Sequence, residues 1–115
     1  MSDFKNECYE LAHKHVLCIE FVLSDTERLG FHTGQLLHYR LEPNSSDQTD
    51  APPEKLMIAF ATADVVILGM KLSTLANHLR DGDLLSVRAL PSRYANLDRN
   101  KTYVASITVT PIDKS

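Results

Sequence analysis

His13 and His15 are the two side chains whose type and spacing come nearest to metal chemistry. Residues two apart on an extended strand point to the same side, so both imidazoles could bind one ion. Cys18 would face the opposite side of such a strand, and no Cys-x-x-Cys or His-Glu-x-x-His pattern supplies further ligands. His13 and His15 are therefore metal candidates, and the alternative, which the sequence favours, is that they are solvated or hydrogen-bonded histidines.

Basic and aromatic side chains are interleaved in residues 88–103, within the more basic half of the chain. Through Asp64 there are eleven acidic residues and five Lys or Arg, and from Val65 on there are four and seven. Cations that contact phosphates, together with rings that stack on bases, are typical of surfaces for single-stranded nucleic acid. The candidates are Arg88, Arg93, Tyr94, Arg99, Lys101 and Tyr103. The alternative is a solvated charged loop, because the net charge of −3 gives no global attraction to nucleic acid.

Patterns typical of catalysis are scarce. Neither Ser73 nor Ser86 lies in a Gly-x-Ser-x-Gly sequence, and no Gly-Lys-Ser/Thr sequence is available to hold a phosphate. Asp81 and Asp83 resemble paired carboxylates, but they flank Gly82, and we interpret that tripeptide as the exit from a helix. The sequence predicts no cofactor and leans against an enzyme, while a small enzyme that uses His13 and His15 stays an alternative.

One helix is predicted over about residues 72–81. The apolar side chains that share its buried face are spaced at i, i+3, i+4 and i+7, and they are Leu72, Leu75, Ala76 and Leu79. Ser73 is expected to cap its start and Gly82 to close its end. The helix lies between apolar segments of β character, so we expect it to pack across a small sheet.

Most other apolar segments alternate or are rich in β-branched residues, which predicts strands. Residues 56–68 read as a hairpin. Residues 1–13 are expected to be frayed or a short helix, and residues 42–55 a mobile polar loop without core contacts. The expected strands are 16–23, 29–33, 35–41, 56–61, 65–69, 84–90 and 102–112.

The chain has 115 residues, 43% of them hydrophobic and 23% charged, which fits one soluble globular domain spanning residues 1–115. The order of elements predicts an α+β fold rich in β structure: a small curled antiparallel sheet or partly open barrel of about five to six strands. The helix would lie between the central and C-terminal strands. Over about residues 15–112 this order is similar to the oligonucleotide/oligosaccharide-binding fold, and to Sm-like and pleckstrin-like folds. A topological likeness implies no function.

The sequence favours a non-catalytic interaction or regulatory module that self-associates, with a protein partner also possible. Residues 102–112 alternate and contain no Pro, Gly or charge between Thr102 and Thr110, so at a sheet edge they would be free to pair with a second copy. Binding of single-stranded nucleic acid through residues 88–103 is an alternative. We expect a cytoplasmic chain with reduced thiols and no membrane partner, since no signal-like or membrane-spanning apolar segment is evident.

Overall fold

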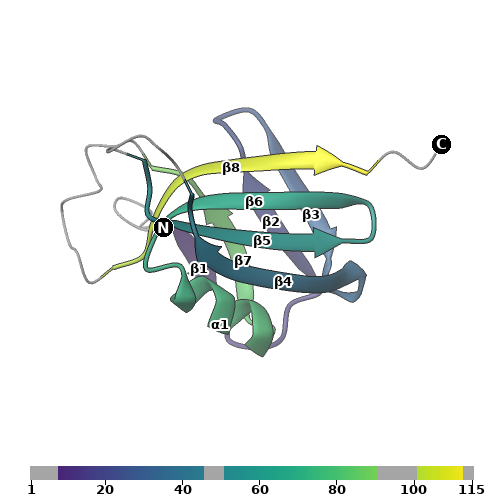
Figure 1. The fold of residues 1–115 in the computed structure, drawn as a ribbon. Helices are drawn as coiled ribbons and strands as arrows, with labels where there is room; N and C mark the ends of the chain where they lie inside the picture. Colours follow the sequence, from purple (N-terminus) through teal and green to yellow (C-terminus); the bar gives the residue numbers. More distant parts are fainter. Residues whose placement is uncertain (1–7, 46–50, 91–100, 113–115) are drawn as a thin grey trace.

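The computed structural model describes residues 8–45, 51–90 and 101–112, and these ranges form two four-stranded sheets and one α-helix. Sheet A has the order β1-β7-β2-β3 and sheet B the order β4-β5-β6-β8. In Figure 1 the strands of sheet B cross in front of those of sheet A. The elements are β1 (Tyr9–Leu11), β2 (Cys18–Val22), β3 (Arg28–His32), a 3-10 turn (Thr33–Gln35), β4 (Leu36–Pro43), β5 (Glu54–Phe60), β6 (Ala63–Met70), α1 (Ser73–Asp81), β7 (Leu84–Arg88) and β8 (Tyr103–Pro111).

Sheet A joins segments that are far apart in the sequence. β7 lies between β1 and β2, so that Ser86 has Glu10 opposite it on one side and Glu20 on the other. The β1 pairing is antiparallel and the β2 pairing is parallel, which departs from the purely antiparallel sheet that the sequence predicts. The N-terminal helix is also wrong over residues 9–11, because β7 offers these residues hydrogen-bond partners, and the Arg88 N–H donates to the Cys8 carbonyl at 2.7 Å. Residues 1–7 lie outside the described residues.

Sheet B is formed mainly by a meander of neighbouring strands. β5 and β6 form the predicted hairpin, which turns at Ala61 and Thr62, and β8 returns to pair with β6. The predicted loop over residues 42–55 is too long at both ends, because β4 continues to Pro43 and β5 begins at Glu54. The Asn44 N–H donates to the Pro53 carbonyl at 3.0 Å, which extends the hairpin. Its expected mobile centre, residues 46–50, lies outside the described residues.

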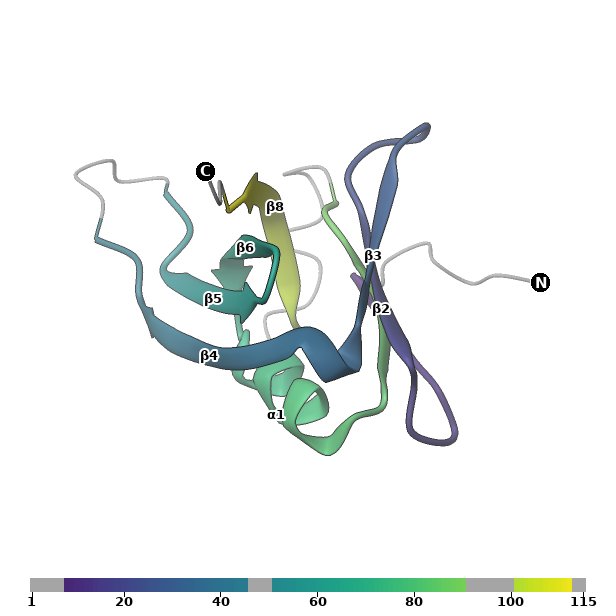
Figure 2. The same ribbon diagram turned by 90° about the vertical axis from the view of Figure 1, so that its right-hand side faces the viewer.

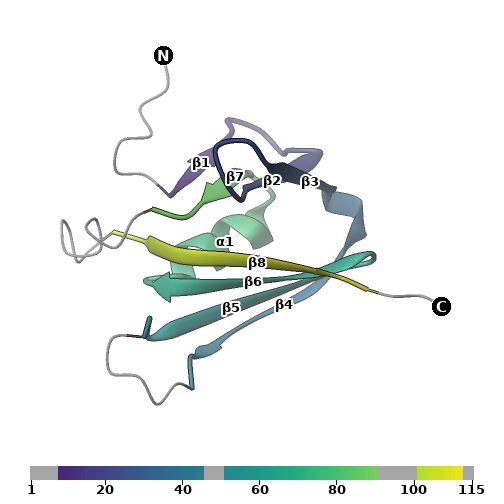
Figure 3. The ribbon, with the colours of Figure 1, turned by 90° about the horizontal axis from the view of Figure 1, so that it is seen from above.

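The core lies between the two sheets, which Figure 3 shows one above the other. Phe31 of β3 stacks on Phe60 of β5 with ring centroids 4.5 Å apart, and Phe21 of β2 meets both rings edge-on. Helix α1 closes one end of this space (Figure 2), and its Leu75 and Leu79 are buried as predicted. Burial of a leucine side chain contributes about 1.5–3 kcal/mol to folding. The helix therefore holds the two sheets together.

The two ends of α1 show different outcomes for the predicted caps. Gly82 ends the helix in the left-handed region, with φ of 81°, and donates its N–H to the His78 carbonyl at 3.0 Å, as predicted. Ser73 is not the N-cap, because it is already the first helical residue. The position before it, Leu72, has no capping side chain of its own, and Glu54 of β5 accepts the Leu72 N–H at 2.7 Å. A side chain of the neighbouring strand β5 therefore accepts a hydrogen bond from the backbone at the start of the helix.

The α+β class is confirmed, whereas the predicted number of strands is too low. The described residues contain eight strands in two sheets, and they form no closed barrel. β1 adds a strand where a frayed end or short helix was expected, and the pairing of β7 with β1 and β2 divides the strands between two sheets. In this part of the chain no helix combines the length and apolar character needed to cross a membrane.

Candidate functional site

The metal candidates His13 and His15 lie in the exposed connection between β1 and β2. This connection is fastened to the turn after α1, since the Ala12 N–H donates to the Asp83 carbonyl and the Val16 N–H to the Gly82 carbonyl, each at 2.9 Å. A hollow of about 340 Å³ separates the two histidines from Asp81 and Asp83. Within the residues that the structure describes, no group of three or more His, Cys, Asp or Glu side chains is arranged to hold a metal ion.

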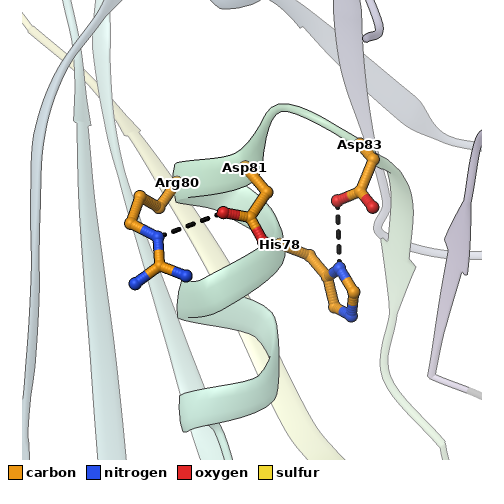
Figure 4. Close-up of polar contacts among 4 residues, drawn as sticks. All are labelled: His78, Arg80, Asp81 and Asp83. Carbon is orange, nitrogen blue, oxygen red and sulfur yellow. Dashed lines mark hydrogen bonds and ion pairs between the residues drawn. The ribbon is translucent and has the colours of Figure 1, made fainter. Parts of the chain in front are cut away.

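The carboxylates of Asp81 and Asp83 contact two different side chains of the helix (Figure 4). His78 Nδ1 lies 2.9 Å from Asp83 Oδ1, and the Arg80 Nε–H donates to Asp81 Oδ1 at 3.1 Å. Gly82 between them is held in the left-handed region that glycine adopts most readily. The tripeptide therefore ends the helix and directs the chain into β7, in agreement with its interpretation from the sequence.

The structure describes three of the predicted nucleic-acid candidates, and they differ in exposure. Arg88 lies at the end of β7 and lines a hollow on the outer face of sheet A, and Lys101 is exposed before β8. Tyr103 is only 8% exposed, and its hydroxyl donates to the Leu90 carbonyl at 3.1 Å. Burial, with a smaller contribution from Cys8, raises the pKa of Tyr103 above its ordinary value. Tyr103 therefore serves the core. Arg93, Tyr94 and Arg99 lie outside the described residues.

β8 is an edge strand of sheet B, and other described residues contact its outer side near its start. At Val104 the carbonyl accepts the Leu90 N–H at 3.0 Å, and the N–H donates to Cys8 Sγ at 3.2 Å. A register shift opposite Leu68 and Gly69 leaves Ala105 without a partner in β6, and the two residues before it, Tyr103 and Val104, are both buried although they alternate in direction. Beyond this point, no strand of the described ranges pairs with the outer side of β8.

The hydrogen bonds at the end of β8 show which backbone groups face outward. The Ile112 N–H donates to the Thr62 carbonyl at 3.0 Å, and the pairs that follow toward the strand centre are Pro111 with Ala63 and Thr110 with Asp64. Bonded and non-bonded pairs alternate in an antiparallel ladder. Ile107, Val109 and Pro111 therefore direct their backbone groups away from β6, and Pro111 lacks the N–H that would be unpaired there. This stretch, Ile107–Pro111, is called the open edge below.

β3 is an edge strand of sheet A, and its outer side can be assigned in the same way. The Thr33 N–H donates to the Leu17 carbonyl at 2.8 Å, and the Leu23 N–H to the Glu27 carbonyl at 2.9 Å. These bonds lie at the two ends of an unbroken register between β2 and β3. Arg28, Gly30 and His32 consequently turn their N–H and carbonyl groups away from β2.

Four residues in register cross the outer face of sheet A, and we call them the carboxylate row after their two glutamates: Glu10, Ser86, Glu20 and Gly30, the last without a side chain. Ser86 is 6% exposed and its hydroxyl donates to Glu10 Oε1 at 3.1 Å. Beside the row, a hollow of about 410 Å³ is lined by Glu10, Glu20, Arg28 and Arg88 among others. Arg28 reaches Glu20 at 3.5 Å.

Comparison of the chain with family models, with curated proteins and with solved structures found no match.

The sequence indicated β8 as a candidate edge strand, but it did not lead us to Gly30 in β3. The uncharged alternation of residues 102–112 pointed to β8 as a strand for self-pairing. The importance of Gly30 was missed, although a glycine inside a strand of β-favouring residues was a visible signal.

Proposed function

We propose that this chain is a non-catalytic interaction module that self-associates through the open edge of β8. The observation that carries the proposal is the combination of unpaired backbone groups at Ile107 and Val109 with uncharged side chains along the edge. Natural sheets protect exposed edges with charges, bulges or prolines. Here the only such protection is Pro111, at the very end of the stretch.

The open edge is complementary to itself under two-fold symmetry. With the axis at Thr108, Ile107 of one copy lies opposite Val109 of the second, and each of these pairs can exchange two hydrogen bonds. Pro111 then lies opposite Ala105, beyond the two central bonded pairs, so its missing N–H removes no bond from these pairs. The two sheets B would join into one continuous sheet, with the two Thr108 side chains facing each other on its outer surface.

Sedimentation at micromolar concentration tests the proposal with the substitution Thr108→Lys. Thr108 is exposed on the outer face, so the fold of one copy should tolerate lysine, whereas two lysines at the axis repel each other. We expect a parent dimer that Thr108→Lys weakens about tenfold or more. Thr26→Lys, which adds the same charge to the exposed turn between β2 and β3, is the control and should leave the dimer intact. A monomeric parent rejects the proposal, and a dimer indifferent to Thr108→Lys moves the interface elsewhere.

A further inference from the structure

Gly30 occupies the centre of β3 although no contact among the described residues requires a glycine there. The register with β2 is unbroken around it, and Gly82 is the only glycine of the described residues with a positive φ. A Cβ built on Gly30 would have the Ile19 carbonyl oxygen, at 4.0 Å, as its nearest contact. Glycine inside a strand lowers stability by about 0.5–1 kcal/mol relative to alanine. Such a glycine often marks a place where another backbone or a ligand approaches closely.

The backbone of Gly30 is available to a neighbour on the outer side of sheet A. Its N–H and carbonyl face away from β2, as do those of Arg28 and His32, and β2 is the only strand beside β3 among the described residues. An added strand would therefore form its central hydrogen bonds with Gly30. The inner side of β3 is already supported by Phe31, which packs on Phe60.

The carboxylate row determines which side chain fits opposite Gly30. Neighbouring strands are about 4.8 Å apart, so an added residue opposite Gly30 would lie about 10 Å from Glu20 with no side chain between them. A lysine and a glutamate side chain together span that distance. Glu20 is 44% exposed and already receives Arg28 at 3.5 Å, which shows that its carboxylate is accessible from the side of β3.

Arg28 and His32, which lie two positions before and after Gly30 on the same face of β3, favour acidic residues opposite them. Arg28 is a cation with 67% of its side chain exposed. His32 accepts the Gly34 N–H at Nδ1 with a distance of 2.9 Å, so in the neutral ring Nε2 carries the proton and can donate to a carboxylate. Pairing of β3 with a second copy about Gly30 would place Arg28 opposite His32. A different partner with acidic residues at these two positions fits better.

From these features we infer that β3 binds an extended segment of a partner protein by strand addition. The side chains of that segment on the outer face follow the pattern acidic-x-basic-x-acidic, with the basic residue opposite Gly30 and reaching Glu20. This site is separate from the open edge of β8 and does not depend on self-association. Main-chain bonds would supply most of the affinity, and the charge pattern would supply the specificity.

Nuclear magnetic resonance with two synthetic peptides tests the inference. The matching peptide is Thr-Glu-Val-Lys-Val-Glu-Thr, and the charge-reversed control is Thr-Lys-Val-Glu-Val-Lys-Thr. At millimolar peptide we expect the matching one to shift the amide signals of Arg28, Gly30 and His32 more than those of Leu29 and Phe31. The net charge of the chain, −3, would favour the control peptide, so a preference for the matching peptide cannot come from bulk charge. Equal or stronger binding of the control, or no shift at β3, overturns the inference.

Two substitutions test separately the missing side chain at Gly30 and the negative charge at Glu20, and a third serves as the control. Gly30→Thr places a side chain between the added lysine and Glu20, where a Cβ has room, and should weaken the matching peptide about as much as loss of the ion pair while the protein stays folded. Glu20→Gln should weaken the matching peptide about two- to fivefold, as expected for one exposed ion pair. Glu27→Gln removes an equal charge outside the carboxylate row and should leave the affinity unchanged. Full binding by Gly30→Thr, or equal effects of the two glutamine variants, contradicts the inference.

Discussion

β3 and β8 are both edge strands with apolar inner faces, yet they present different chemistry to a neighbour. The open edge of β8 has no charged side chain and can pair with its own copy about Thr108. β3 has Arg28 and His32 on either side of Gly30, so its own copy is a poor partner. The two proposals together imply that side chains on the outer face, and not the outward-facing backbone groups that both strands share, decide which neighbour an edge accepts.

One core supports both edge strands, and Leu79→Ala should disturb that core more than any other substitution considered below. Leu79 is 4% exposed, between the sheets at the closed end, so its truncation should lower the free energy of unfolding by about 2–5 kcal/mol. Asn77→Ala, on the exposed side of the same helix, should change it little. Urea unfolding measures both. Similar midpoints for the two variants would mean that α1 does not hold the sheets together.

Gly69→Ala is expected to have the next largest effect, because Gly69 differs from Gly30 in what surrounds it. A Cβ on Gly69 would lie 1.9 Å from the backbone oxygen of Tyr103, so β6 and β8 must move apart to accept alanine. Overpacking of this kind lowers stability by about 1–3 kcal/mol. The same urea experiment checks it, and an unchanged midpoint would show that the start of β8 is not fixed against β6.

Tyr103→Phe probes the occupied end of β8. Loss of the hydrogen bond to the Leu90 carbonyl should lower stability by about 0.5–1.5 kcal/mol at neutral pH. Because burial raises the pKa of Tyr103, the folded chain retains this proton at a pH where the unfolded chain loses it. The stability of the parent should therefore decline as the pH rises above about 10, the ordinary tyrosine pKa. The phenylalanine variant should show a smaller decline in urea titrations at alkaline pH.

Gly30→Ala should have the smallest effect, and its sign is opposite to that of the other three. Since a Cβ there makes only an ordinary van der Waals contact with the Ile19 carbonyl oxygen, alanine should raise the free energy of unfolding by about 0.5–1 kcal/mol. Thermal and urea unfolding of the purified variant provide the measurement. A loss of stability would mean that the fold itself requires glycine at this position, and the case for a partner at β3 would then fail.

The elements that depend on local spacing could be predicted from the sequence. The i, i+3, i+4, i+7 pattern gave α1 its buried face, Gly82 marked its end, and the small polar turn between β5 and β6 marked the hairpin. These features depend on residues within a few positions of one another, so one sequence contains the information needed to predict them.

The features that depend on distant partners could not be predicted. Residues 9–11 are a strand because β7, more than seventy residues later, lies beside them, and the hydrogen bond from Ser86 to Glu10 spans 76 positions. Glu54 of β5 likewise accepts the N–H of Leu72 at the start of α1, eighteen positions later in the sequence. The sequence predicted that β8 could pair with a second copy if it lay at a sheet edge, but it could not predict that β8 lies there. Strand order decides which strand lies at an edge, and no local pattern contains that order.

The position of β7 between β1 and β2 sets the order in which the molecule can assemble. β2 with β3, and β4 with β5 and β6, can pair as soon as each hairpin is available, because their contacts are close in sequence. β1 and β2 do not pair with each other, because each pairs with β7 instead, and closing the long segment of chain between β1 and β7 is slow. The amides of β1 should thus gain protection from hydrogen exchange last during refolding, and a ribosome must complete β7 before sheet A can form.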